Sequence, residues 1–231
     1  LDVLSASSIA DRVEWHQNDG SEGFTTRLLS GGTSFAQSVH AADLNGDGHT
    51  DLLSAASINS TSNGGANTIA WYENDGENRF TAHTLTLSVD GPSSVYATDL
   101  DGDTDLDVLS SSRGDSTVVW YENLDRGGFS RPIVISTNVP NASAVRAADL
   151  DKDGDQDVLA AGPVSSSKGV VAWFENDGTG SFSGRTDITT SAVGVESIHT
   201  ADFSGNDSLD VVIAAPGRTE VVWHENQGVS F

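Results

Sequence analysis

The most restrictive feature of this 231-residue chain is a motif that contains all five of its Trp residues. It reads VEWHQNDG, IAWYENDG, VVWYENLD, VAWFENDG and VVWHENQG around Trp15, Trp71, Trp120, Trp173 and Trp223. Successive Trp residues lie 56, 49, 53 and 50 positions apart, and each is followed by a Phe, at Phe24, Phe80, Phe129, Phe182 and Phe231. This period predicts one array of stacked units, in which neighbours bury the faces that a single unit leaves open.

A second, acidic motif recurs between the Trp motifs. It reads ADLNGDGHTDLLSAA from Ala42, TDLDGDTDLDVLSSS from Thr98, ADLDKDGDQDVLAAG from Ala148 and ADFSGNDSLDVVIAA from Ala201. The opening LDVLSASS matches the end of the same motif, with Asp2 at its last acidic position. We therefore expect a processed or excised piece of a longer array, without a linker or a second domain.

Within each unit the local signals favour strands. Segments such as SVHAADL and TIAWYEN are short, rich in β-branched or aromatic residues, and bounded by Gly, Asp and Asn. About four strands in a unit of this length predict an all-β fold, a β-propeller of about five four-stranded blades with incomplete terminal blades. The expected blades span about 1–36, 37–90, 91–138, 139–190 and 191–231, with about eighteen strands in all. Two interpretations stay open: part of a longer array or larger ring, and a five-blade ring whose gap another segment fills.

Composition excludes several classes of protein. The chain has 34 acidic and 11 basic residues and a formal net charge of -23, which disfavours nucleic acid as a partner. No apolar run reaches the roughly 18 residues of a membrane-spanning helix, and the absence of Cys excludes disulfides and thiolate metal sites. Unpaired strand edges in the terminal blades predict a tendency to self-associate.

The acidic motif predicts a calcium loop. Counted from its first Asp, oxygen-bearing side chains recur at positions one, three, five and nine, a Gly allows a sharp bend at position six, and a carbonyl is available at position seven. The candidate metal ligands are Asp43, Asn45, Asp47, His49 and Asp51 in loop 1, Asp99, Asp101, Asp103, Asp105 and Asp107 in loop 2, Asp149, Asp151, Asp153, Asp155 and Asp157 in loop 3, and Asp202, Ser204, Asn206, Ser208 and Asp210 in loop 4.

About three to four Ca²⁺ ions are expected in these loops. Four matched copies are more than a hairpin turn requires, and bare carboxylates in one loop would repel one another. Four ions would change the formal charge from -23 to about -15. Loop 4 should bind weakest because it offers only two Asp side chains at the ligand positions, and Thr104 and Asp207 replace the Gly at position six of loops 2 and 4. An EF-hand is disfavoured, since position twelve is Ser54, Ser110, Ala160 or Ile213 in place of Glu.

The DLDGDGDxD type of loop followed by DVL, together with the W-[YFH]-[EQ]-N turn, resembles the FG-GAP/VCBS repeat family, which includes the integrin α-chain propellers. The resemblance covers essentially the whole chain. It implies a β-propeller with Ca²⁺ in the hairpin between the first two strands of a blade, on extracellular or cell-surface proteins. Members of that family serve as adhesion modules, as lectins, and as scaffolds for polysaccharide lyases or sugar dehydratases, so the fold alone does not select a function.

Few residues qualify as a unique site. The Trp residues recur identically, which favours packing between blades over sugar stacking. One variable position, three residues before each loop, holds His40, Tyr96, Arg146 and His199. If the first strand is innermost, as the resemblance implies, these side chains gather at one end of a central channel and would suit an anionic or carbohydrate ligand. A purely structural role in the strand is the alternative. Asn59 and Asn141 lie in N-glycosylation sequons.

The sequence favours an extracellular, calcium-stabilised propeller that acts as a binding, adhesion or assembly module for a protein or glycan partner. No catalytic residue is assigned, because nucleophile, zinc and phosphate-binding motifs are missing. Three alternatives stay open: a carbohydrate-binding lectin, a propeller-type polysaccharide lyase or sugar dehydratase that would use the four variable residues, and a structural subunit of an extracellular fibre.

Overall fold

The computed structural model describes residues 1–31, 35–57, 67–217 and 219–228. These residues form eighteen β-strands in five antiparallel sheets, and none of them forms a helix that could cross a membrane. Each sheet is a simple meander of consecutive strands. The three, four, four, four and three strands of the sheets agree with the number predicted from the repeat. Asn59 and Phe231, two residues named in the sequence analysis, lie outside the described residues.

The strands of the five sheets have the following bounds. Sheet 1 contains β1 (Val3–Ser7), β2 (Arg12–Asn18) and β3 (Phe24–Gly31). Sheet 2 contains β4 (Ala36–Ala42), β5 (Asp51–Ala56), β6 (Thr68–Asn74) and β7 (Phe80–Thr86). Sheet 3 contains β8 (Pro92–Thr98), β9 (Asp107–Ser112), β10 (Thr117–Tyr121) and β11 (Ile133–Ser136). Sheet 4 contains β12 (Ala144–Ala148), β13 (Asp157–Ser165), β14 (Lys168–Phe174) and β15 (Thr186–Thr189). Sheet 5 contains β16 (Ser197–Ala201), β17 (Asp210–Ala215) and β18 (Glu220–His224).

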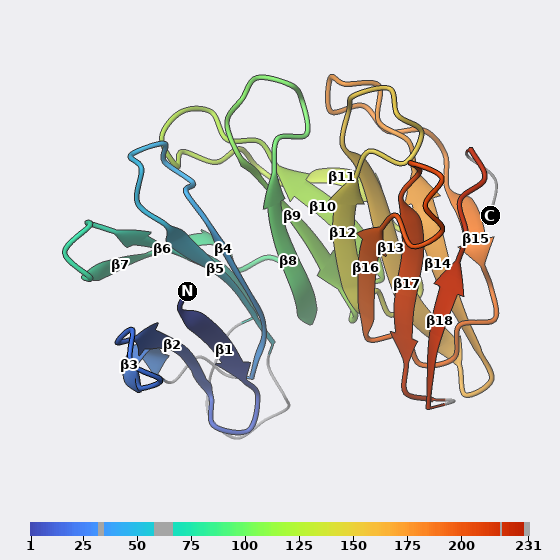
Figure 1. Cartoon of the computed structure of the whole chain (residues 1–231). Helices are drawn as coiled ribbons and strands as arrows, with labels where there is room; N and C mark the ends of the chain where they lie inside the picture. The colour runs from blue at the N-terminus through green and yellow to red at the C-terminus, as the bar shows by residue number, and fades with distance from the viewer. Residues whose placement is uncertain (32–34, 58–66, 218, 229–231) are drawn as a thin grey trace.

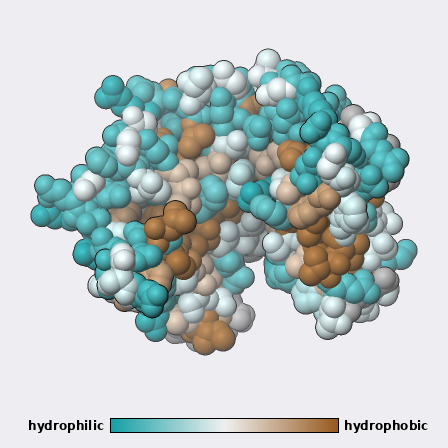
Figure 2. Space-filling model, viewed as in Figure 1, coloured by the Kyte–Doolittle hydropathy of each residue, from teal (hydrophilic) through white to brown (hydrophobic). Residues whose placement is uncertain are grey.

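The sheets follow one another along an arc, and the first strands β4, β8, β12 and β16 lie next to one another (Figure 1). Sheets 1 and 5 lie at the two ends of the arc, and Figure 2 shows a deep notch between them. Among the described residues no strand pairing joins these two sheets. The described residues therefore form an open series of face-to-face sheets.

The second strand of each inner sheet is buried over most or all of its length. Every residue of β5 and β9 is buried, as are the first six residues of β13. Successive side chains of a strand point to opposite faces of its sheet. Both faces must therefore be covered, one by the preceding sheet and one by the next. This explains why these strands are continuously apolar or small, without the polar alternation of a one-sided sheet.

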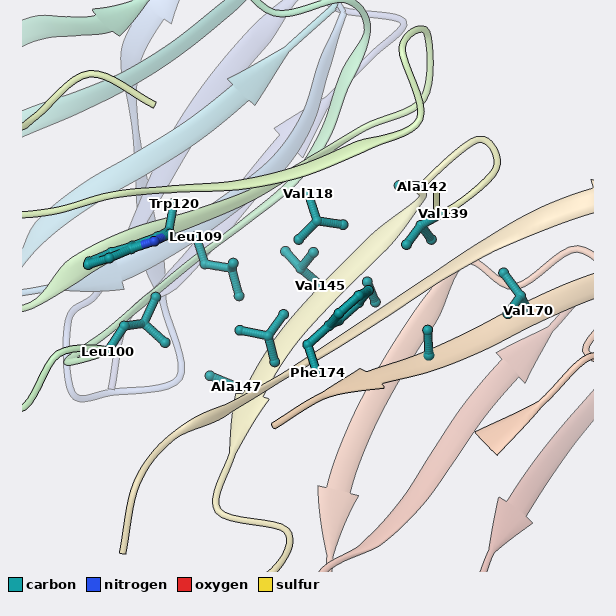
Figure 3. Packing of buried hydrophobic residues seen from close by; sticks show 13 residues of the cluster. Leu100, Leu109, Val118, Trp120, Val139, Ala142, Val145, Ala147, Val170 and Phe174 are labelled. Atoms are coloured by element: carbon teal, nitrogen blue, oxygen red, sulfur yellow. The ribbon is translucent and has the colours of Figure 1, made fainter. Parts of the chain in front are cut away.

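The hydrophobic core is divided into clusters between successive sheets. The cluster between sheets 3 and 4 contains thirteen buried residues, and Figure 3 shows Leu109 and Trp120 of sheet 3 facing Val145 and Phe174 of sheet 4. The cluster between sheets 4 and 5 contains twelve buried residues, and the cluster between sheets 2 and 3 contains ten. The cluster between sheets 1 and 2 contains three. Sheet 1 is therefore held by much less buried apolar surface than the others.

The predicted packing role of the Trp motif is confirmed in four of the five copies. Trp15, Trp71, Trp120 and Trp173 are buried, and the ring of Trp71 meets Phe129 of the next sheet edge-on at 6.4 Å between centroids. Trp223 differs, with half of its surface exposed. The difference has a physical reason, because no described sheet follows sheet 5 and covers that face.

Candidate metal sites

The four acidic loops connect the first and second strands of sheets 2 to 5. In each loop the first Asp accepts hydrogen bonds from backbone N–H groups farther along the same loop. In loop 1, for example, the Asp43 carboxylate accepts from Asp47 N at 3.2 Å and from Gly48 N at 2.8 Å. The N–H at position seven donates to the side chain at position five in all four loops. These bonds curl the backbone around the first carboxylate and place alternate side chains on the inside of the bend.

All four loops make the same bend at position six, although two lack Gly there. The φ angles are 86° at Gly48, 101° at Gly154, 80° at Thr104 and 66° at Asp207. This left-handed region costs a β-branched residue such as Thr more than it costs Gly. Thr104 and Asp207, which replace the expected Gly, therefore leave the bend in place, and the bend is strained at Thr104.

The Asp at position nine is fully buried and joins the loop to the end of the third strand. In loop 3, Asp157 Oδ2 accepts from Leu150 N at 3.1 Å, and its Oδ1 accepts from Asn176 N at 2.9 Å. Asp51, Asp107 and Asp210 accept the equivalent pairs of bonds. This residue consequently organises the loop through its own hydrogen bonds.

Loops 2 and 3 bring carboxylates together. Oxygens of Asp99, Asp101 and Asp107 lie within 4.8 Å of one another, and so do those of Asp149, Asp151 and Asp153. Loops 1 and 4 form no comparable group of three acidic or His side chains among the described residues. Their donor sets include Asn45, or Ser204 and Asn206. The geometry therefore separates the two all-Asp loops from the two mixed ones. The order of binding strength stays a prediction.

The electrostatics of these loops oppose bare, ionised carboxylates. Burial raises the pKa of Asp107 to about 7 and that of Asp157 to about 6, and neighbouring Asp side chains add to the rise in both loops. Burial also raises the pKa of Asp101 and Asp151, with further contributions from nearby carboxylates. Burial is thus the larger cause and mutual repulsion the smaller. A cation in the loop would offset both, and an all-oxygen donor set fits a hard cation such as Ca²⁺.

An Asn in the Trp motif has a role that the sequence did not reveal. Asn123, Asn176 and Asn226 are buried, and each donates its side-chain N–H to a Leu carbonyl in the acidic loop of the preceding sheet. The acceptors are the carbonyls of Leu44, Leu100 and Leu150, at 2.8, 2.7 and 2.8 Å. Each Asn therefore ties two sheets together. The recurrence of this Asn in every unit indicates a structural role. The sequence alone does not identify its partner, because the Leu lies 76 to 79 residues earlier in the chain.

Three of the four variable first-strand residues gather as predicted, and we call His40, Tyr96 and Arg146 the inner-strand cluster. The Tyr96 ring lies 4.6 Å from the His40 ring and 4.6 Å from the Arg146 guanidinium carbon. A cavity of about 260 Å³ lies beside them. Burial lowers the pKa of His40 to about 4, and the charge of Arg146 contributes. His199 is exposed and does not line this cavity.

Asn141 is exposed, and its side-chain N–H donates to the Pro163 carbonyl at 3.0 Å. Asn59 lies outside the described residues.

Comparison with known proteins agrees with this repeat. Among solved structures, the V. cholerae biofilm matrix protein Bap1 matches with a TM-score of 0.52 and 19% identity, over 99% of this chain and 37% of that chain. A chain of the Photorhabdus luminescens Tc holotoxin pore matches with a TM-score of 0.49 and 19% identity, over 97% of this chain and 11% of that one. This chain therefore spans well under half the length of either protein. A search of curated proteins found no match.

The profile of the FG-GAP-like repeat matches four segments, residues 1–54, 55–110, 99–160 and 150–213. Each of these segments ends within the second strand of a sheet and therefore contains a complete acidic loop. Together the segments cover most of the sequence. The chain belongs to the FG-GAP-like repeat family.

Proposed function

We propose that this chain is a calcium-stabilised β-propeller array that acts as a binding, adhesion or assembly module. The convergence of three carboxylates within 4.8 Å in each of loops 2 and 3 carries the proposal. Asp99, Asp101 and Asp107 would hold one ion, and Asp149, Asp151 and Asp153 another. The ions serve structure and not catalysis, because they neutralise buried charge in loops that lie between packed sheets. With loop 1 and the weaker loop 4, about three to four ions are expected.

An extracellular location follows from the same chemistry. Loops of modest affinity fill at the millimolar calcium concentrations found outside cells. The V. cholerae protein of similar fold is a biofilm matrix protein by its name, and an assembly role outside the cell is compatible with that likeness. The strongly negative net charge would also be reduced by bound calcium, which favours contact with a protein or glycan partner.

The test is a calcium titration of the chain after removal of metal with EDTA. Calcium should raise the melting temperature, and calorimetry should count three to four ions, while Mg²⁺ at the same concentration should have a smaller effect. Asp101→Asn and Asp151→Asn should each remove one site. Asp125→Asn, an exposed position outside the loops, is the control. An unchanged melting temperature in EDTA would remove calcium from the proposal.

The inner-strand cluster supports a second candidate function, which is binding of a carbohydrate or small anion. Arg146 is held over the Tyr96 ring, and its Nε atom is buried without a hydrogen-bond partner among the described residues. A ligand oxygen could satisfy that donor from the adjacent cavity. Glycan-array binding that is lost in Arg146→Ala and retained in Arg131→Ala, an exposed control, would support this site. Binding that both variants retain would place the ligand elsewhere.

A further inference from the structure

Loop 1, between β4 and β5 (Figure 1), has Asn followed by Gly at positions three and four. The same two positions are Asp-Gly in loop 2, Asp-Lys in loop 3 and Ser-Gly in loop 4, so loop 1 alone has a side-chain amide there. Gly46 is exposed, and a Cβ added to it would meet nothing within 4 Å beyond its chain neighbours. The backbone nitrogen of Gly46 therefore follows the Asn45 amide with no side chain to obstruct it.

The N–H at position four distinguishes loop 1 from the other three loops. In loops 2, 3 and 4 this N–H donates to Oδ1 of the first Asp, at 2.7 Å in each case. In loop 1 the Asp43 Oδ1 accepts from Asp47 N instead, at 3.2 Å, and the N–H of Gly46 has no hydrogen bond among the described residues. A carboxylate that accepts from an N–H opposes loss of the proton, because it would repel the anionic nitrogen. Gly46 N is the position-four nitrogen without this restraint.

The amide of Asn45 is held by Asp47. Asn45 Oδ1 accepts from the Asp47 N–H at 3.1 Å, and Asn45 Nδ2 donates to Asp47 Oδ2 at 3.2 Å. A donor on Oδ1 stabilises the negative charge that develops on this oxygen when a nucleophile adds to Cγ. The amide carbon is thus polarised, and the following backbone nitrogen reaches it by closing a five-membered ring.

We propose that Asn45 is a site of spontaneous deamidation. After hydroxide removes its proton, Gly46 N forms a bond to Cγ of Asn45, and the bond from Cγ to Nδ2 breaks. Ammonia leaves with a proton taken from water, and a cyclic imide remains. Water then opens the imide at Cγ to give aspartate, or at the main-chain carbonyl carbon to give isoaspartate. The overall reaction consumes water, releases ammonia and changes no oxidation state.

The two products have opposite effects on loop 1, a consequence that rests on the calcium function proposed above. Aspartate at position three gives loop 1 the four-Asp donor set of loops 2 and 3, and the added charge should strengthen calcium binding. Isoaspartate lengthens the backbone by a carbon atom between positions three and four, which disrupts the alternation of ligands. A bound ion that engages Asn45 Oδ1 would hold the amide away from Gly46 N, so calcium should slow the reaction.

The experiment follows Asn45 in the whole chain by peptide mapping and mass spectrometry during incubation at mildly alkaline pH, in EDTA and in calcium. Deamidation exchanges NH for O. The map separates Asn45 from Asn63, which begins the other Asn-Gly pair of the sequence and lies outside the described residues. A synthetic peptide ADLNGDGHTD, residues 42–51, is the unfolded reference. In EDTA, Asn45 of the folded chain should convert within about tenfold of the peptide rate, or about 1.4 kcal/mol in the activation barrier.

Two Gly variants form a matched pair. Gly46→Ala should slow the conversion of Asn45 by about tenfold or more, because a side chain at this position obstructs ring closure. Loop 3 carries Lys152 at the same position with a φ of 67°, so this bend accepts a side chain. Gly205→Ala makes the same change at position four of loop 4, after Ser204, and should leave the conversion of Asn45 unaffected.

The outcomes test the modification and the calcium function separately. The proposal is overturned if Asn45 in EDTA converts more than about tenfold more slowly than the peptide, or equally fast in wild type and Gly46→Ala. Conversion that is equally fast in EDTA and in calcium supports the modification and counts against an ion in loop 1. A titration in which Asn45→Asp binds calcium no more tightly than wild type overturns the stated consequence for loop 1, whatever the mass spectra show.

Discussion

Replacing Asn176 by Ala should be one of the most damaging single changes that remove only a polar side chain. Its amide donates to Leu100 O at 2.7 Å and to Gln156 O at 3.0 Å. The variant leaves the buried Leu100 carbonyl in loop 2 and the partly buried Gln156 carbonyl in loop 3 without this donor. An unsatisfied buried group costs about 1 to 3 kcal/mol. The free energy of unfolding should therefore fall by about 2 to 5 kcal/mol.

The chain contains its own control in Asn18. The side chain of this equivalent residue is half-buried and, among the described residues, donates only to Leu1 O, at 3.1 Å. Asn18→Ala should cost less than about 1 kcal/mol, because water can replace the exposed hydrogen bonds of this side chain with Leu1 O and Gly20 N. Urea unfolding followed by Trp fluorescence measures both variants in the same buffer. Equal losses for Asn176→Ala and Asn18→Ala would refute the idea that this Asn joins successive sheets.

Three further predictions concern single residues. Thr104→Gly should raise the free energy of unfolding by about 1 kcal/mol, since it relieves a positive φ of 80° at a β-branched residue, and Gly154→Thr should lower it, as urea titrations can show. Trp120→Ala should cost about 3 to 5 kcal/mol and Trp223→Ala much less, because only the first ring is buried between sheets. For His40 the folded pKa of about 4 lies below the ordinary value of 6.5, so the folded state resists protonation. The contribution of His40 to the free energy of unfolding should be constant above about pH 7 and fall by roughly 2 to 3 kcal/mol as the pH decreases from 6.5 to 4. The difference in the free energy of unfolding between wild type and His40→Gln, measured across that range, isolates this contribution.

The features that repeat locally could be predicted from the sequence. The loop motif at Asp149 to Asp157 predicts a bend with alternate oxygens on its inner side, and the structure places three of those carboxylates together. The small and apolar run after Asp157 predicts a strand, and β13 begins there. These predictions succeed because each depends on residues within about ten positions of one another, and the four copies average out local irregularities.

The features that depend on neighbouring units were harder to predict. Asn176 resembles an ordinary turn residue until the loop that contains Leu100, 76 residues earlier, is seen against it. Trp223 shares the pattern VVW-x-E-N with Trp120, but it lies in the last described sheet of the arc and is half exposed. His199 has the same place in its strand as Arg146 but does not share the cavity beside the inner-strand cluster. In each case the environment is set by an adjoining sheet and not by the local motif.

The buried Asp and Asn residues connect the acidic loops into a series. Asp99 begins loop 2, Leu100 follows it and accepts from Asn176, and the backbone of Asn176 donates to Asp157, which ends loop 3. Any ion that orders loop 2 also fixes the carbonyl that sheet 4 uses to dock, so calcium would act on the contact between sheets more than on the sheets themselves. Because Asn176 and an ion in loop 2 would stabilise the same contact, their contributions should be non-additive, whereas Asn18 should be independent of that ion.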